Sequence, residues 1–298
     1  MQVKLDGITK KFGRVTAVDQ LSFTVEDNSI LGLIGPNAAG KTTTLKIISG
    51  LLAPTSGRVL YDDGLERPPT FYYWPGSSFG WVANLGRWLE TYAMYFGFTR
   101  REAKERVKWL AEKFSFTEHL NKYDWTASFG TRMKVLVSLS FIPEAELYCL
   151  DEPFPGLDPY TRRTVSDTIR ELRDKGKTMI ISSHVLGEIE GICDKVVVIN
   201  RAKLVTSGPP MVLKKAMHQR RFEVVFDGQP PQQLRDVAEN LGLNLSVKQD
   251  VTTIFGIVKE DFSAEAILSI LPRDRVLSTT LRLPSLEEIV EGIAAESL

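Results

Sequence analysis

Short apolar runs alternate along the first two thirds of the chain with longer stretches whose apolar residues recur at helical spacing. Four runs are apolar enough for strands buried on both faces: 30–34, 147–150, 178–182 and 196–199. Helical spacing follows at 41–49 and 161–175, and shorter strands are expected at 3–5 and 21–25. This alternation predicts an α/β fold with a parallel sheet covered by helices on both faces.

A mainly helical region is expected to interrupt this α/β unit at about residues 75–145. Aromatic residues concentrate in residues 71–98, and helical patterns follow at 100–114 and 134–141. Trp88, Tyr92 and Tyr95 recur at helical spacing, which is typical of packing between helices. We therefore predict a helical subdomain inserted between strands of the α/β unit.

The last third of the chain has a different order of elements. Gly-Pro-Pro followed by basic residues indicates a linker, which we place at 209–220, so that the α/β unit occupies residues 1–208. Strand patterns then occur at 221–226, 243–248, 252–258 and 276–283, with helical patterns at 232–241, 264–271 and from 285. The order β-α-β-β-α-β predicts a small α+β accessory domain of the split βαβ type over residues 221–298.

The bulk composition excludes several classes of protein. The 298 residues include 37 Lys or Arg and 37 Asp or Glu, so the net charge gives no indication of binding to nucleic acid or acidic lipid. Cys149 and Cys193 lie in apolar runs, which fits a reducing compartment and leaves no disulfide framework. The longest uncharged stretch, 68–86, is interrupted by prolines and cannot form a spanning helix. If the protein acts at a membrane, another polypeptide must supply the spans.

A phosphate-binding pattern, G-x-x-x-x-G-K-[ST], follows the run at 30–34. Its residues are Gly35, Pro36, Asn37, Ala38, Ala39, Gly40, Lys41, Thr42 and Thr43. The two glycines let backbone N–H groups point at phosphate oxygens, with a helix N-terminus behind them. Lys41 is expected to reach the β- and γ-phosphates, and Thr42 to give its hydroxyl to Mg²⁺. The segment therefore predicts a nucleotide-binding site, a P-loop.

Two carboxylates, Asp151 and Glu152, directly follow the run at 147–150. Asp151 is expected to bind Mg²⁺ through water, and Glu152 to polarise a water molecule aimed at the γ-phosphate. In isolation, such a pair is more often the start of a loop or a helix cap. The P-loop upstream favours the catalytic interpretation.

Together these motifs resemble the ATPase subunits of the ATP-binding cassette (ABC) family, over about residues 1–210. Pro155-Gly-Leu-Asp158 is similar to the D-loop of that family, and Ser182-Ser-His184 to its switch histidine. In the family, two such domains enclose two ATP molecules, each held by the P-loop of one chain and the signature loop of the other. The resemblance implies that Phe12 stacks on adenine, that His184 contacts the γ-phosphate, and that Asp158 communicates across the dimer. The catalytic residues it implies are Lys41, Glu152 and His184.

One departure from the family pattern concerns the Q-loop glutamine, which helps to hold Mg²⁺ and senses the membrane partner. It is absent, because no glutamine occurs between Gln20 and Gln219, and alignment of the motif puts Gly76 in its place. A milder departure is Ala38, which replaces the usual glycine of the P-loop. We expect alanine to be tolerated there if its φ is negative.

The second main departure is the signature, usually Leu-Ser-Gly-Gly-Gln, which here reads Ala-Ser-Phe-Gly-Thr at 127–131. Ser128 and Gly130 can still present a hydroxyl and an N–H group to the γ-phosphate of a partner's ATP. Phe129 adds bulk where glycine allows close approach. The chain thus keeps its own catalytic residues but offers a poor signature. This asymmetry favours a heterodimer with a second ABC ATPase subunit over a homodimer.

The resemblance implies an ATPase with the cofactors ATP and Mg²⁺ that drives a separate transmembrane permease from the cytoplasmic face of the cell membrane. Phe79 and Trp81 lie where family members receive the membrane subunit, and serve either in docking or in the core of the helical subdomain. The final Leu283-Pro-Ser-Leu-Glu-Glu-Ile-Val resembles the tail of exporter-type subunits, so export is expected. Two alternatives remain: a regulatory subunit with little turnover, and a soluble cassette protein without a transport function. No nucleic-acid partner is expected, since no basic stripe is visible.

Overall fold

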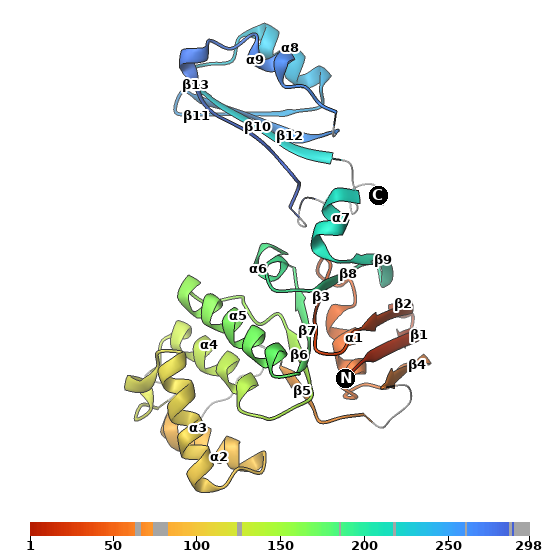
Figure 1. Ribbon diagram of the computed structural model, residues 1–298, viewed down its shortest axis with the longest axis vertical. Coiled ribbons are helices and arrows are strands. Elements are labelled where there is room, and N and C mark those ends of the chain that lie inside the picture. Colours follow the sequence, from red (N-terminus) through yellow and green to blue (C-terminus); the bar gives the residue numbers. More distant parts are fainter. Residues whose placement is uncertain are drawn as a thin grey trace. The chain divides into compact units, whose positions relative to one another are not determined.

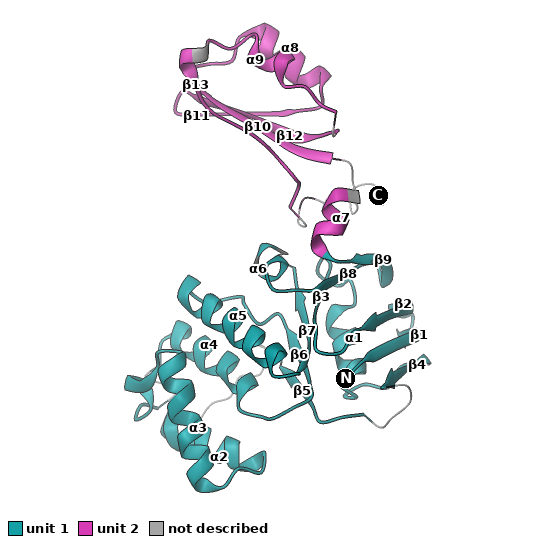
Figure 2. Ribbon diagram, viewed as in Figure 1, with its two compact units in different colours: residues 1–209 teal, residues 210–298 magenta. Residues whose placement is uncertain are grey.

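The computed structural model describes residues 1–62, 67–73, 83–123, 127–184, 186–216, 219–259, 261–285 and 288. The chain divides into two compact units, residues 1–209 and 210–298 (Figure 2). The boundary falls between two successive prolines, Pro209 and Pro210. Each unit buries a hydrophobic core of its own, so each is a separate packing unit.

A six-stranded sheet forms the centre of the first unit, in the order β5-β6-β7-β3-β8-β9 (Figure 1). Its strands are β3 (Ile30–Ile34), β5 (Thr70–Tyr73), β6 (Leu147–Asp151), β7 (Thr178–Ser183), β8 (Lys195–Asn200) and β9 (Lys203–Gly208). Neighbouring strands are parallel except β8 and β9, which form an antiparallel hairpin. Every residue of β3, β6 and β7 is buried. The predicted parallel sheet is therefore confirmed, and its four apolar runs are β3, β6, β7 and β8.

A three-stranded antiparallel sheet, in the order β2-β1-β4, contributes to the same core. Its strands are β1 (Val3–Phe12), β2 (Val15–Val25) and β4 (Ser56–Tyr61). The first two are much longer than the predicted runs at 3–5 and 21–25, and β4 has no counterpart in the prediction. Buried and exposed residues mix along these strands, and register shifts between β1 and β2 interrupt the alternation. The apolar pattern is therefore weak where the strands are longest.

The helices of the first unit are α1 (Lys41–Ile48), α2 (Leu85–Tyr95), α3 (Arg100–Lys113), α4 (Phe129–Ser138), α5 (Pro159–Asp174) and α6 (Leu186–Glu190), with 3₁₀ turns at Thr117–His119 and Leu139–Phe141. Four of them, α2 to α5, begin at a polar residue whose side chain caps the first turn. Thr99 and Glu102 form a capping box at the start of α3. Ser128 caps α4, so this helix begins five residues before the predicted 134–141 segment and ends before its 3₁₀ turn. In the part of the chain that the structure describes, no helix has the length and apolar character needed to cross a bilayer.

The second unit carries a four-stranded antiparallel sheet in the order β11-β12-β10-β13. Its elements are α7 (Pro210–Ala216), β10 (Gln219–Asp227), α8 (Gln232–Asn240), β11 (Asn244–Lys248), β12 (Val251–Lys259), α9 (Glu265–Leu268), a 3₁₀ turn (Arg273–Arg275) and β13 (Val276–Arg282). The β-α-β-β-α-β order confirms the predicted split βαβ fold. Phe222, Val224 and Phe226 of β10 and Leu234 of α8 lie in its core.

The linker predicted at 209–220 differs from the structure. Residues 210–216 form α7, and β10 begins at Gln219. Pro210 occupies the first position of α7, where its missing N–H group costs nothing because that position has no partner within the helix. The two prolines thus mark a helix start as well as a boundary. Of the predicted helix from 285, the structure describes only Ser285 and Glu288, so most of it lies outside the described residues.

The turn that joins β3 to α1 needs backbone conformations that most residues avoid. A Cβ atom on Gly35 would lie 2.1 Å from the carbonyl oxygen of Ile199, and Gly40 has a φ of +105°. Ala38 also lies in the left-handed region, with a φ of +64°. The expectation of a negative φ at Ala38, on which its tolerance depended, is therefore wrong. Ala38 holds a conformation that costs about 1 kcal/mol or more in a residue with a Cβ atom.

Two tyrosines on the neighbouring strands β5 and β6 differ in their hydrogen bonding. The buried Tyr148 hydroxyl donates to the carbonyl oxygen of Pro143 at 2.7 Å and accepts from the backbone N–H of Ala145 at 3.1 Å. The Tyr73 hydroxyl is buried too, but has no hydrogen-bond partner among the described residues. Burial raises the pKa of both phenols, so both remain protonated near neutral pH.

Replacing Tyr148 by Phe should lower the free energy of unfolding by about 1 to 3 kcal/mol, because a buried carbonyl and a buried N–H group lose their partner. The matched change Tyr73→Phe removes an unpaired hydroxyl and should leave stability unchanged or raise it. Urea unfolding followed by tryptophan fluorescence measures both. Equal losses in the two variants would show that hydrogen bonding does not distinguish these positions.

Ala38→Gly should raise the free energy of unfolding by about 0.5 to 1 kcal/mol, since relief of the left-handed strain exceeds the extra entropy of glycine in the unfolded chain. The neighbouring Ala39 is buried and does not have a positive φ. Ala39→Gly relieves no strain and adds backbone entropy to the unfolded chain, so it should destabilise the protein. Thermal unfolding without nucleotide measures both variants. A loss of stability in Ala38→Gly would contradict the strain argument.

Candidate functional site

The carboxyl ends of β3, β6 and β7 lie side by side and carry most of the predicted chemistry. In the parallel register, Ser182 of β7 lies between Leu33 of β3 and Asp151 of β6. The chain leaves β3 into the P-loop, β6 into Glu152 and β7 into His184. Because the carboxyl ends of parallel strands meet at one edge of a sheet, three segments distant in sequence converge here.

Lys41, the first residue of α1, is buried and fully engaged. Its ammonium donates to the carbonyl oxygens of Gly35 at 2.7 Å and Pro36 at 3.2 Å. It also lies 3.4 Å from Oε1 of Glu152. The P-loop carbonyls and a carboxylate therefore neutralise the lysine at the start of the helix, where an incoming phosphate could replace them.

Glu152 connects Lys41 to His184. Its Oε2 atom lies 2.8 Å from Nδ1 of His184, on the side of the carboxylate away from the lysine. Its backbone has a φ of +49°, and its N–H group donates to Oγ of Ser182 at 3.0 Å. Left-handed backbone in a residue with a side chain is costly and is found where the surrounding structure holds it in place, often at functional sites. The structure thus brings together the three predicted catalytic residues.

Asp151 is 2% exposed, and its carboxylate is hydrogen-bonded at both oxygens. The Ser182 hydroxyl donates to Oδ1 at 2.5 Å, and the Tyr72 hydroxyl donates to Oδ2 at 3.1 Å. Sequence reasoning gave Tyr72 no role. A strand at this position was not predicted, so Tyr72 becomes informative only once β5 is known to pair with β6.

A cavity of about 440 Å³ lies against the P-loop. Its lining residues come from the β1–β2 hairpin, the P-loop and Glu152: Phe12, Val15, Thr16, Ala17, Asn37, Ala38, Ala39, Gly40, Lys41, Thr42, Thr43 and Glu152. Phe12 is 51% exposed, and the Lys10 ammonium lies 5.2 Å from its ring centroid. An aromatic ring, a phosphate-binding turn and a carboxylate therefore share one cavity. The sequence analysis missed the β2 residues of this lining.

Ser128, Gly130 and Asp158 lie elsewhere, and none of them lines this cavity. Ser128 caps α4, and Asp158 caps α5 by accepting hydrogen bonds from the backbone and side chain of Thr161. The Lys134 ammonium lies 3.3 Å from Asp158 and joins the two helices. The hydrogen bonds from Thr161, together with Lys134, lower the pKa of Asp158 to about 2. These predicted residues therefore form a second group, separate from the P-loop.

Phe129, the first residue of α4, is 71% exposed. Its ring lies against Gly156 of the D-loop, where an added Cβ atom would be 3.3 Å from the ring edge. Gly156 has a φ of +78°, so a side chain there would be strained as well. The altered signature and the D-loop thus form one surface with an exposed aromatic ring on it.

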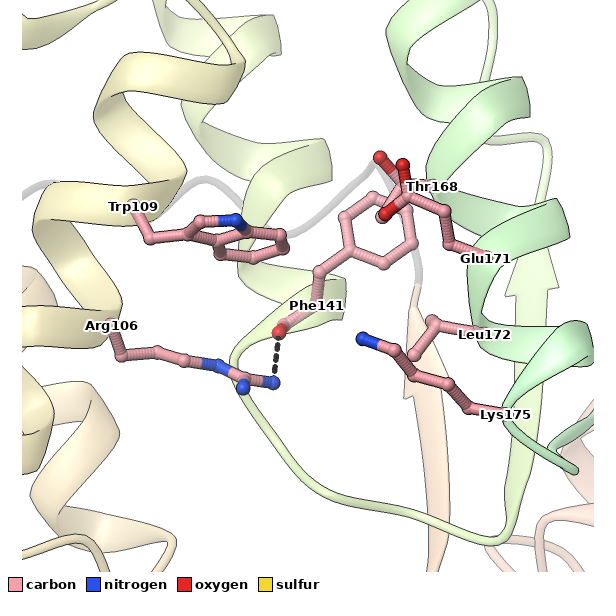
Figure 3. Close-up of a pocket in the computed structure, with 7 residues that line it drawn as sticks. All are labelled: Arg106, Trp109, Phe141, Thr168, Glu171, Leu172 and Lys175. Atoms are coloured by element: carbon pink, nitrogen blue, oxygen red, sulfur yellow. Dashed lines mark hydrogen bonds between the residues drawn. The ribbon is translucent and has the colours of Figure 1, made fainter.

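A further cavity of about 350 Å³ lies away from the P-loop, between α3, the turn Leu139–Phe141 and α5 (Figure 3). At its edge, Arg106 donates to the carbonyl oxygen of Phe141 at 2.8 Å. The Lys113 ammonium lies 2.6 Å from a carboxylate oxygen of Glu171 and 5.2 Å from the centroid of Trp109. The Lys113–Glu171 ion pair attaches α3 to α5, and the Arg106 hydrogen bond attaches α3 to the turn. No predicted site residue lines this cavity.

Some sequence predictions concern residues outside the described parts of the chain. Gly76 at the expected Q-loop position, and the docking candidates Phe79 and Trp81, all lie in 74–82. They remain predictions. Within the described ranges, no group of three or more His, Cys, Asp or Glu side chains is arranged to hold a metal ion by itself.

Comparison with known proteins gives a consistent result. Residues 18–155 match the family model described as "ABC transporter". The chain is 33% identical over 216 residues to "Probable multidrug ABC transporter ATP-binding protein YbhF" of Escherichia coli (strain K12), which covers 70% of this chain and 37% of YbhF. It is 30% identical over 220 residues to "ABC transporter ATP-binding protein NatA" of Bacillus subtilis (strain 168), covering 71% of this chain and 89% of NatA. The chain thus spans little more than a third of YbhF and most of NatA.

Structural comparison supports the same assignment. A solved structure entitled "Structure of ATP binding subunit of ABC transporter" matches with a TM-score of 0.66 and 25% identity, over 73% of this chain and 93% of that one. By the family model, the relatives and the fold, this chain belongs to the ABC transporter family as an ATP-binding subunit with a P-loop NTPase core.

Proposed function

We propose that this chain hydrolyses ATP to drive export through a separate transmembrane permease, from the cytoplasmic face of the membrane. The proposal depends above all on Glu152, which lies 3.4 Å from the Lys41 ammonium and 2.8 Å from the His184 imidazole. A carboxylate beside a phosphate-binding lysine is placed to orient the water that attacks a γ-phosphate. Export is supported by the relative YbhF, which is named as a probable multidrug transporter protein, and by the exporter-like sequence at residues 283–290.

The lining of the cavity at the P-loop suits the two parts of ATP. Phe12 and Val15 contribute apolar side chains from the β1–β2 hairpin, to which we assign the adenine. The turn 35–43 offers backbone N–H groups at a helix N-terminus, to which we assign the phosphates. On binding, the Lys41 ammonium would exchange the carbonyls of Gly35 and Pro36 for phosphate oxygens.

The donor set also fits Mg²⁺. Thr42 offers a hydroxyl and Asp151 a carboxylate, which are the hard oxygen ligands that this ion takes alongside water and substrate phosphates. Both oxygens of Asp151 accept a hydrogen bond, so its orientation is set before any ion binds. When bound, Mg²⁺ neutralises charge on the transferring phosphoryl group.

The remaining chain residues then have distinct roles. Glu152 accepts a hydrogen bond from the attacking water and aligns it with the γ-phosphate. His184 orients Glu152 through the 2.8 Å contact and can approach the same phosphate. Lys41 compensates the negative charge. These three groups are preorganised, because Glu152 and His184 directly follow strands of one buried sheet and Lys41 begins the helix after the P-loop.

The second group of residues is assigned to a dimer interface. Ser128, Gly130 and Asp158 do not reach the cavity of their own chain, so they are available to complete that of a partner. Phe129 places an exposed ring at this surface, where the partner's phosphate must approach. We propose a heterodimer, in which this P-loop pairs with an unaltered signature from a second ABC ATPase subunit.

One alternative has specific support. The missing Q-loop glutamine and the exposed Phe129 would also suit a regulatory subunit that binds ATP with little turnover. The geometry around Glu152 argues against this alternative, because a chain without turnover has no need to hold that residue between Lys41 and His184. Measurement of turnover separates the two functions.

Glu152→Gln should lower Mg²⁺-dependent ATP hydrolysis by at least about 100-fold, because the water loses its carboxylate acceptor. ATP affinity should stay within about twofold, since the amide keeps the shape of the side chain. Phosphate release by the full chain mixed with candidate partner subunits, and binding of a fluorescent ATP analogue, measure these effects. Glu171→Gln, outside the P-loop cavity, is the control. A parent chain without turnover in every mixture would favour the regulatory function.

In the Glu152→Gln background, Mg²⁺-ATP should leave this chain monomeric, because Phe129 hinders closure over a second copy. Adding Phe129→Gly should restore a homodimer, and light scattering distinguishes the two masses. Tyr160→Ala removes another exposed aromatic ring, two residues after Asp158, and should not restore it. A clean homodimer with Phe129 intact would overturn the heterodimer proposal and leave the ATPase proposal standing.

A further inference from the structure

Tyr72 lies in the middle of β5, on the strand that borders β6. The parallel register places it beside Cys149. Asp151 is two residues further along β6, on the same face of the sheet as Cys149 because side chains alternate along a strand. Tyr72 therefore reaches its diagonal neighbour across the strand pair, and its hydroxyl donates to Oδ2 of Asp151 at 3.1 Å.

The Tyr72 side chain has little freedom to leave this position. The residue is partly buried and packs against the core shared by the two sheets of the first unit. The hydroxyl donates to the carboxylate, because an ionised carboxylate can only accept hydrogen bonds.

The other oxygen of the carboxylate is held from the opposite strand. Ser182 of β7 donates to Oδ1 of Asp151, and its oxygen also accepts from the N–H group of Glu152 at 3.0 Å. Each carboxylate oxygen has two lone pairs, so one on each remains for water or an ion. Two donors from two strands thus define the plane of Asp151 and the direction in which its free lone pairs point.

We propose that Tyr72 is a positioning residue for magnesium binding, which holds Asp151 in the orientation that receives the Mg²⁺ of the ATP complex. This inference rests on the proposed function, in which Asp151 is the acidic group of the metal site. The chain has no glutamine between Gln20 and Gln219, so the Q-loop glutamine of the family is missing. Tyr72, on the strand before the expected Q-loop position, gives the Asp151 carboxylate a fixed polar contact. A partner that orients a metal-binding group contributes to affinity without touching the metal.

The inference is tested by how strongly Mg²⁺ and nucleotide binding are coupled. The probe is the nonhydrolysable ATP analogue adenylyl imidodiphosphate, whose Kd is measured for the full chain with excess Mg²⁺ and with EDTA. The coupling is the ratio of the Kd measured in EDTA to the Kd measured with Mg²⁺. Tyr72→Phe should reduce this ratio by about tenfold, the loss typical of removing a partner of a metal ligand, while the Kd in EDTA changes by less than about twofold.

Tyr73→Phe is the matched control. It removes a hydroxyl from the next residue of the same strand, and this hydroxyl has no hydrogen-bond partner among the described residues. Its ratio should equal that of the parent. A ratio unchanged in Tyr72→Phe, or reduced equally in Tyr73→Phe, would overturn the positioning role. Urea unfolding of each variant shows whether the fold is retained.

Asp151→Asn separates this inference from the proposed function. If Asp151→Asn leaves the coupling intact, the metal assignment is wrong and the role of Tyr72 falls with it. If Asp151→Asn reduces the coupling and Tyr72→Phe does not, only the inference about Tyr72 fails. In the Asp151→Asn background, Tyr72→Phe should have no further effect, whereas a general packing defect would persist there.

Discussion

The parallel alignment of β3, β6 and β7 is the constraint on which the site depends. Each of these strands is buried along its whole length, so a slip of one residue would turn buried side chains to the opposite face. With the register set, Asp151 must face Ser182, and the residues that follow the strands must meet. The site is therefore as rigid as the sheet that carries it.

Charge compensation explains how such a site tolerates burial. A buried ammonium or carboxylate is costly unless it is paired and hydrogen-bonded. Lys41 has two carbonyls and a carboxylate, Asp151 has two hydroxyl donors, and Glu152 lies between a cation and an imidazole. The same groups can exchange partners with a polyphosphate and its cation, because each already holds the complementary charge or donor. Preorganisation of this kind removes much of the reorganisation cost of binding.

The sequence predicted best what depends on local pattern. The buried strands, the P-loop and the two carboxylates at the end of β6 follow from apolar runs and residue spacing, and the β-α-β-β-α-β order of the second unit follows in the same way. The lengths of β1 and β2 and the existence of β4 could not be predicted, because their buried and exposed residues mix and register shifts break the alternation. The role of Tyr72 depends on which strands pair, and the positive φ of Ala38 on how the turn closes. Neither property is visible in a linear pattern.

The two groups of predicted residues lie on different elements and are ordered by separate contacts. One group can therefore be altered while the other stays intact. Asp151, Glu152 and Lys41 are ordered by hydrogen bonds and ion pairs among strand ends and the P-loop. Ser128 and Asp158 are ordered as helix caps, linked through Lys134. A bulky residue at the start of α4 therefore leaves the contacts at the P-loop cavity intact. It changes only the surface at the start of α4, so an altered signature and an intact set of contacts at the P-loop cavity are physically compatible in one chain.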